Sequence, residues 1–87
     1  MEETTQNGAT GRALTFGEKA AGITFNPSNN PEVDRLKRMA ADFIDACNDA
    51  RGNAQSNSAK RYYSTAITGM EKAQMMAVKA ATWQHQD

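Results

Sequence analysis

The residues best suited to binding chemistry lie in the segment FNPSNNPEVDRLK, residues 25–37. Phe25 offers an aromatic ring on which a nucleobase could stack. A helix starting at Pro31 would present unpaired N–H groups and the positive end of its dipole to a phosphate, and Lys37 would add a positive charge. Pro27 and Pro31 would restrict the loop and lower the entropy lost on binding. The same residues also fit an ordinary helix start against which Phe25 packs, and the sequence leaves both interpretations open.

Residues for catalysis are scarce. A serine or cysteine nucleophile needs a nearby base, and the one histidine, His85, lies in the polar end of the chain. Asp42, Asp45 and Asp49 would share one helix face, where paired carboxylates can perform acid–base chemistry, but the basic residues near them favour a solvated charged surface. The sequence contains no phosphate-binding glycine loop and no zinc-ligand spacing. We therefore expect a protein that is not an enzyme, with no catalytic residue, no metal and no cofactor.

Composition narrows the class of partner. The chain has 87 residues, enough for one domain, and its ten basic and ten acidic residues cancel. That balance argues against broad binding of DNA, which requires a basic face. No basic segment precedes an apolar stretch, and no apolar run approaches the ~18 residues of a membrane span. We expect a soluble cytoplasmic protein with a reduced thiol at Cys47, its only cysteine.

The elements that position these residues are two long helices. A first helix is predicted from Pro31, capped by Asn30, to a basic last turn and glycine stop at Arg51–Gly52. Its apolar residues follow a heptad stripe: Val33, Leu36, Ala40, Phe43 and Cys47. After a polar turn at 52–59, a second helix is predicted from about Ser58 to Trp83, capped by Ser58 or Asn57. Its stripe comprises Ala59, Tyr63, Ala66, Met70, Ala73, Ala77 and Ala80.

The fold class predicted is all-α, an antiparallel helical hairpin with a short N-terminal segment. We expect a flexible tail at 1–13, the hairpin domain at 14–83 and a C-terminal tail at 84–87. Residues 14–25 are ambiguous: they can form a short helix over 16–21 that ends at Gly22, followed by an extended segment at 23–25.

The second helix has more apolar surface than one partner helix can cover. Tyr62, Met76 and Trp83 form a flanking stripe, and Ile67, Met75 and Val78 add a third side. A core of this size rarely supplies more than ~3–5 kcal/mol without a staple, and one cysteine cannot form a disulfide within the chain. We therefore expect a homo-oligomer; the alternative is a loose core with extra methionines on the surface.

The chain resembles a known family in two segments. The stretch GEKAAGITFNPSNNPEVDRLKRMAADFIDA (17–46), followed by SAKRYYSTAITGMEKAQMMAVKAATW (58–83), is similar to the phage anti-CBASS cyclic-nucleotide sponges. It also resembles the hairpin domain that they share with some anti-Thoeris sponges. The segments AQMMAVKAATW and VDRLK carry most of the likeness, although Met76 stands where the family usually has tryptophan.

The resemblance implies a homo-oligomer, a hexamer in the sponges, which sequesters cyclic di- or trinucleotide signals such as 3′,3′-cyclic GMP-AMP in the host bacterial cytoplasm without cleaving them. In the family an aromatic residue stacks on a base and a lysine meets phosphate between protomers; by position these are Phe25 and Lys37. Ser28 and Asn29 could donate hydrogen bonds to the same ligand, and Lys79 marks a second candidate position.

Two rival functions remain open on the sequence. One is a structural or protein-binding helical hairpin, such as a small phage accessory factor, with no nucleotide ligand. The other is an oligomer that binds nucleic acid, against which the zero net charge weighs.

Overall fold

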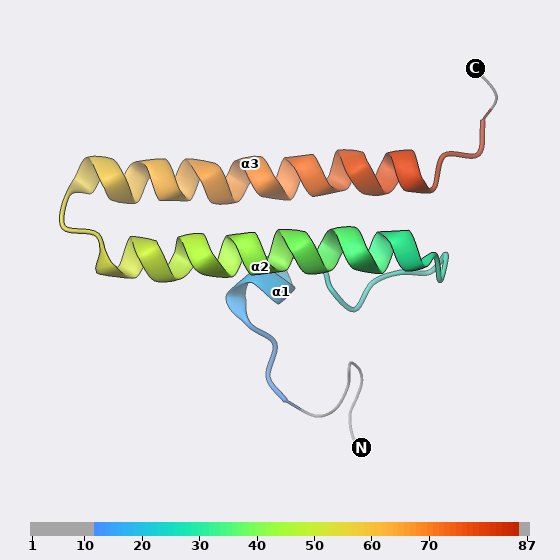
Figure 1. The fold of residues 1–87 in the computed structure, drawn as a ribbon, viewed down its shortest axis with the longest axis horizontal. Helices are drawn as coiled ribbons and strands as arrows, with labels where there is room; N and C mark the ends of the chain where they lie inside the picture. Colours follow the sequence, from blue (N-terminus) through green and yellow to red (C-terminus); the bar gives the residue numbers. More distant parts are fainter. Residues whose placement is uncertain (1–11, 86–87) are drawn as a thin grey trace.

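The structure, a computed structural model, describes residues 12–85 and contains three helices. They are α1 (Phe16–Ala21), α2 (Pro31–Asn53) and α3 (Asn57–Ala81). α2 and α3 run antiparallel side by side, joined by a short turn, and α1 lies against α2 (Figure 1). The described residues contain no strand, so the predicted all-α hairpin is confirmed. Residues 1–11 and 86–87, which make up most of the two predicted tails, lie outside the described residues.

The start of α2 follows the prediction. The side-chain oxygen of Asn30 accepts a hydrogen bond from the Glu32 N–H (2.8 Å), and Pro31 occupies the first helical position, where a missing N–H costs nothing. The Asn30 amide also donates to the Ala81 carbonyl (3.2 Å), which ties the start of α2 to the end of α3. The predicted stop at Gly52 is wrong. α2 continues to Asn53, because Gly52 keeps a helical conformation and does not adopt a positive φ.

α3 begins at Asn57, one residue before the predicted start at Ser58. Its cap is Ser56, whose hydroxyl accepts from the Ala59 N–H (3.0 Å), so the predicted caps Ser58 and Asn57 are wrong. The helix ends at Ala81, and the Thr82 hydroxyl donates to the Val78 carbonyl (2.8 Å). Trp83 therefore lies beyond the helix.

The short helix predicted at 16–21 is confirmed as α1. Thr15 and Glu18 form a reciprocal capping box, in which the Thr15 hydroxyl accepts from the Glu18 N–H (3.1 Å) and the Glu18 carboxylate accepts from the Thr15 N–H (2.9 Å). Gly22 ends the helix in the left-handed region at φ 64°. The extended segment predicted at 23–25 is wrong: Ile23 and Thr24 belong to a turn, in which the Ile23 N–H donates to the Glu18 carbonyl (3.0 Å).

The core is small, and one apolar surface remains uncovered. Its buried side chains form two clusters that both contact Met70: Ala21, Ala40 and Ala41, and Ile44, Cys47 and Ile67. The uncovered surface is an apolar groove between α2 and α3, lined by Leu36, Met39, Ala40, Phe43, Met70, Ala73, Gln74 and Ala77. In that groove Met39 and Phe43 stay 58% and 44% exposed. The Gln74 side-chain oxygen is buried with no hydrogen-bond partner among the described residues.

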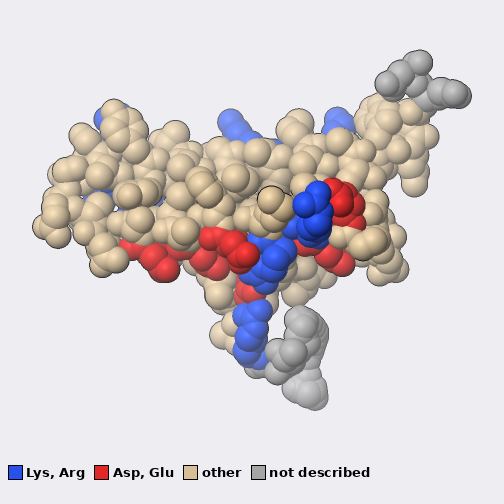
Figure 2. Space-filling model, viewed as in Figure 1, with Lys and Arg blue, Asp and Glu red and all other residues tan. Residues whose placement is uncertain are grey.

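Charge is unevenly distributed on this thin molecule, whose Cα atoms extend only 12 Å along the shortest axis. Seen from the side drawn in Figure 2, acidic side chains gather along α2, whereas most of the surface over α3 carries no charge. None of the described helices combines the length and the apolar content that a membrane crossing requires.

Candidate functional site

The start of α2 and the end of α3 lie together at one end of the hairpin (Figure 1). Residues from both line a pocket of about 290 Å³. The loop after α1 supplies one wall and the two long helices supply the rest. The lining residues are Phe25, Asn26, Pro27, Ser28, Val33, Lys37, Val78 and Thr82. Three of the predicted site residues, Phe25, Ser28 and Lys37, are thus brought together.

Lys37 is the only ionisable residue of this lining, and it is only 6% exposed. Its ammonium donates to the Gly22 carbonyl (2.9 Å) and to the Phe25 carbonyl. Burial lowers the pKa of Lys37, and the charge of the nearby Asp34 partly opposes that shift. Because an ammonium has three N–H groups, these two carbonyls leave one N–H to which the described residues give no partner.

Phe25 is 68% exposed, although it is a large apolar residue. Its ring centre lies 5.3 Å from the Lys37 ammonium, within the range of a cation–π contact. A ring that is mostly exposed does not act as a core side chain of a helix start. The geometry therefore favours the binding interpretation over the packing one, since an aromatic face and a positive charge meet at one pocket.

Of the two predicted hydrogen-bond donors, Ser28 lines the pocket and Asn29 does not. The Ser28 hydroxyl lines the pocket but already donates to the Asn26 side-chain oxygen (2.7 Å) and accepts from the Asn30 N–H (3.2 Å). Asn29 does not line the pocket; it occupies a left-handed turn position with φ 56°. The Asn26 amide donates to the Asn30 carbonyl (2.9 Å) and to the Asp34 carboxylate (3.0 Å). These bonds, in addition to the prolines, hold the loop in shape.

Lys79 lies at a separate hollow on α3, with Met76, Ala80 and Trp83. Its ammonium is 6.0 Å from the centre of the Trp83 ring, which is 51% exposed. The His85 ring meets Trp83 edge to face, with 5.0 Å between ring centres. This second hollow shares no lining residue with the Phe25 pocket, so Lys79 and Lys37 are not brought into one site.

Comparison with protein families gives one match. A family model described as the hairpin domain of Acb2/Tad1 matches residues 18–82. The chain belongs to the Acb2/Tad1 hairpin family. This is the family of anti-CBASS and anti-Thoeris sponges, so the resemblance read from the sequence is confirmed, and membership supports a general role in phage anti-defence through cyclic-nucleotide binding. Comparisons with curated proteins and with solved structures gave no significant match.

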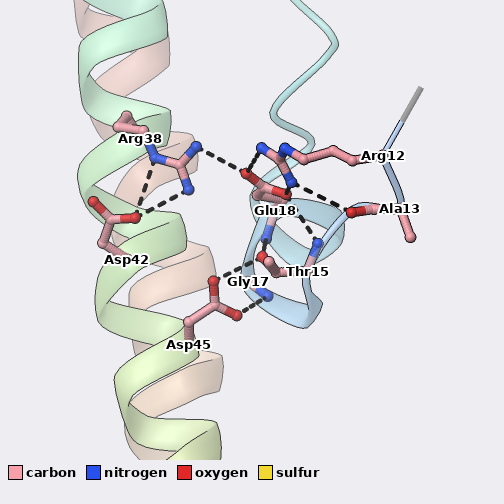
Figure 3. A network of polar contacts seen from close by, with 8 residues as sticks. All are labelled: Arg12, Ala13, Thr15, Gly17, Glu18, Arg38, Asp42 and Asp45. Atoms are coloured by element: carbon pink, nitrogen blue, oxygen red, sulfur yellow. Dashed lines mark hydrogen bonds and ion pairs between the residues drawn. The ribbon is translucent and has the colours of Figure 1, made fainter. Parts of the chain in front are cut away.

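The span shared with the Acb2/Tad1 hairpin family begins at Glu18, a residue that sequence reasoning missed. Glu18 is 2% exposed, and its carboxylate pairs with Arg12 (2.6 Å) and Arg38 (2.9 Å) (Figure 3). The signal that could have located it is the sequence TFGE, whose Thr-x-x-Glu spacing is typical of a capping box. That signal places Glu18 in a first helical turn but does not identify its arginine partners.

The acidic face predicted on α2 is only partly a solvated surface. Asp42 forms an exposed pair with Arg38 (3.0 Å), as expected. Asp45 instead accepts hydrogen bonds from the Gly17 N–H and the Thr15 hydroxyl, both at 2.7 Å, and so belongs to the contact with α1 (Figure 3). Among residues 12–85 no group of three or more His, Cys, Asp or Glu side chains is arranged to hold a metal ion.

Proposed function

We propose that this Acb2/Tad1 hairpin protein binds cyclic oligonucleotide immune signals, cyclic dinucleotides and also cyclic trinucleotides, and sequesters them without cleavage in the cytoplasm of the bacterial host. The observation that carries the proposal is the meeting of the exposed Phe25 ring and the Lys37 ammonium at one pocket. Stacking on an aromatic ring recognises a base, and a charge-assisted hydrogen bond recognises a phosphate.

The pocket also supports a site shared between copies of the chain. Its volume of about 290 Å³ is at the lower limit of small-molecule sites, so one chain would enclose only part of a cyclic dinucleotide. We propose that a second copy supplies the rest, within a homo-oligomer that is a hexamer.

The uncovered apolar groove supports such self-association. In this groove Met39 and Phe43 are exposed, and the Gln74 side-chain oxygen is buried without a donor among residues 12–85. A second copy packed there would cover the two apolar side chains and could donate a hydrogen bond to that oxygen.

Sequestration without cleavage is supported by the chemistry of the lining. Lys37 is its one ionisable group, and no lining residue pairs a nucleophile with a base. The signal would be released intact when the protein is denatured.

Calorimetric titration with 3′,3′-cyclic GMP-AMP and with a cyclic trinucleotide tests the proposal, with heat denaturation and chromatography of the recovered ligand. We expect saturable binding, unchanged ligand and, by light scattering, a mass of six times the 9.5 kDa chain. Linear products formed in proportion to protein would identify an enzyme. Absence of binding to every cyclic nucleotide would favour the structural or protein-binding hairpin.

A further inference from the structure

A buried carboxylate fixes α1 to α2. The Glu18 side chain accepts two hydrogen bonds from the Arg12 guanidinium (2.7 and 2.6 Å) and one from Arg38 on α2 (2.9 Å). Figure 3 shows these three side chains converging from the segment before α1, from α1 itself and from α2. The Glu18 side chain is 2% exposed with α1 in place, and its charged hydrogen bonds to both arginines stabilise this position of α1.

The contact between α1 and α2 is also close at the backbone. A Cβ atom added to Gly17 would lie 2.1 Å from the Ala41 carbonyl oxygen, so no larger residue fits there without moving α1. At the same place Asp45 accepts from the Gly17 N–H and from the Thr15 hydroxyl, each at 2.7 Å. Charge pairing and backbone proximity therefore hold α1 in the same position by independent means.

The position of α1 sets the position of the pocket wall. Gly22 is the C-cap of α1, and its carbonyl accepts a hydrogen bond from Lys37 (2.9 Å). Phe25 follows three residues later; its N–H donates to the Gly22 carbonyl (2.9 Å), and its own carbonyl accepts from Lys37. If α1 were displaced, Gly22 would move with it, and the Phe25 ring would no longer keep its orientation relative to the Lys37 ammonium.

We propose that Glu18, held by Arg12 and Arg38, is a positioning residue for nucleotide binding: the docked α1 orients Phe25 and Lys37 toward one ligand. This inference rests on the proposed function. The cluster of Ile44, Cys47 and Ile67 joins α2 to α3, although Ala20 of α1 also packs against it, so we expect the hairpin to stay helical when α1 detaches. Only the fraction of molecules with docked α1 then binds, and the apparent affinity falls in proportion to that fraction.

The test uses two substitutions that detach α1 by different means. Glu18→Gln removes the charge, and Gly17→Ala introduces the 2.1 Å clash without changing any charge. Glu32→Gln is the matched control, since it makes the same charge change in the exposed pair with Arg35 on α2. Calorimetry with 3′,3′-cyclic GMP-AMP measures affinity, circular dichroism measures helicity, and amide hydrogen exchange over residues 16–23 reports whether α1 is docked.

We expect Glu18→Gln and Gly17→Ala each to lower the affinity by about tenfold or more. Helicity should be retained and exchange over 16–23 should be faster, while Glu32→Gln behaves as the parent. Affinity and exchange over 16–23 should change together in both variants, because both substitutions act on one docking equilibrium. A loss of affinity in Glu18→Gln with parental exchange over 16–23 would show that Glu18 acts on the ligand by another route and would overturn the proposal.

Two further results overturn it. One is parental affinity in variants whose 16–23 amides exchange rapidly, which leaves the proposed function intact because the parent still binds. The other is unchanged exchange in both variants, which shows that these contacts do not hold α1. A parent that binds no cyclic nucleotide refutes the proposed function itself, and the positioning role with it.

Discussion

Replacing the Lys37 ammonium should weaken both the fold and the ligand site. Lys37→Met keeps the length and the apolar stem of the side chain and removes only the charged donor. In the parent that donor bridges the carbonyls of Gly22 and Phe25, at the two ends of the turn after α1. Without it both carbonyls lose a charged partner, and the loop is no longer fastened to α2 at this point.

The size of the effect follows from the two bonds. Hydrogen bonds from a charged group contribute about 1.5–3 kcal/mol each, which gives an upper estimate of about 3–6 kcal/mol. The variant also no longer buries an ammonium, whose desolvation already lowers the Lys37 pKa, and this gain offsets part of the loss. We expect the free energy of unfolding to fall by about 2–3 kcal/mol, which in a domain of this size lowers Tm by roughly 8–24 °C.

Thermal unfolding followed by circular dichroism at fixed protein concentration measures this change. Arg35→Met is the matched control because it removes the same charge from the same helix. Arg35 is 62% exposed, and its contacts with Glu32 and with the Met39 sulfur are exposed, so little stability depends on it. Arg38 would be a poor control because it also holds Glu18. Equal Tm values for Lys37→Met and Arg35→Met would refute the reasoning, since Lys37 would then be a surface side chain without carbonyl partners.

Three further predictions test the rest of the molecule. Ala73→Glu places a charge in the uncovered apolar groove, so light scattering should give the 9.5 kDa mass of a single chain. Thr68→Glu, which lies outside that groove, is the control and should keep the oligomer. If Ala73→Glu stays oligomeric, the interface does not include the groove. Hydrogen bonds from Arg12 first, and from the Thr15 N–H, hold the Glu18 pKa well below its ordinary 4.5, so the stability it contributes is present above pH 4.5 and is lost as the pH falls below it. Melting curves against pH should show this loss in the parent and a smaller one in Glu18→Gln; equal slopes would contradict it. Phe25→Ala should weaken binding of 3′,3′-cyclic GMP-AMP by about 1–3 kcal/mol in calorimetry while Phe25→Tyr keeps it, and equal affinities would remove the stacking role.

The hairpin itself could be predicted because its signals are local. The heptad stripe from Val33 to Cys47 and the pair Asn30–Pro31 define α2 without reference to any other part of the chain. The cap of α3 was missed because the segment QSNS offers several side chains of equal capping ability. Which of them meets the first N–H groups depends on the path of the turn, and Ser56 does so because the turn is shorter than its composition suggested.

The candidate site was predictable only in part: Phe25, Ser28 and Lys37 line one pocket, whereas Asn29 and Lys79 do not line it. The family resemblance predicted that Phe25 and Lys37 share one binding site, and both residues line the pocket. The carbonyl partners of Lys37 are 12 and 15 residues away, and the Arg38 partner of Glu18 is 20 residues away, so they depend on where α1 docks. That docking depends on Gly17, whose lack of a side chain gives no periodic signal in a sequence.

The two long helices and the segment that precedes them contribute different features to the pocket. α2 and α3 supply a scaffold, the Lys37 side chain and the pocket floor at Val33 and Val78. The segment from Arg12 to Asn30 supplies the aromatic ring and the carbonyls that orient the ammonium. Because two of the three ammonium N–H groups donate to that segment, at most one remains for a ligand, and a ligand that needs more than one hydrogen bond from Lys37 would have to displace the segment.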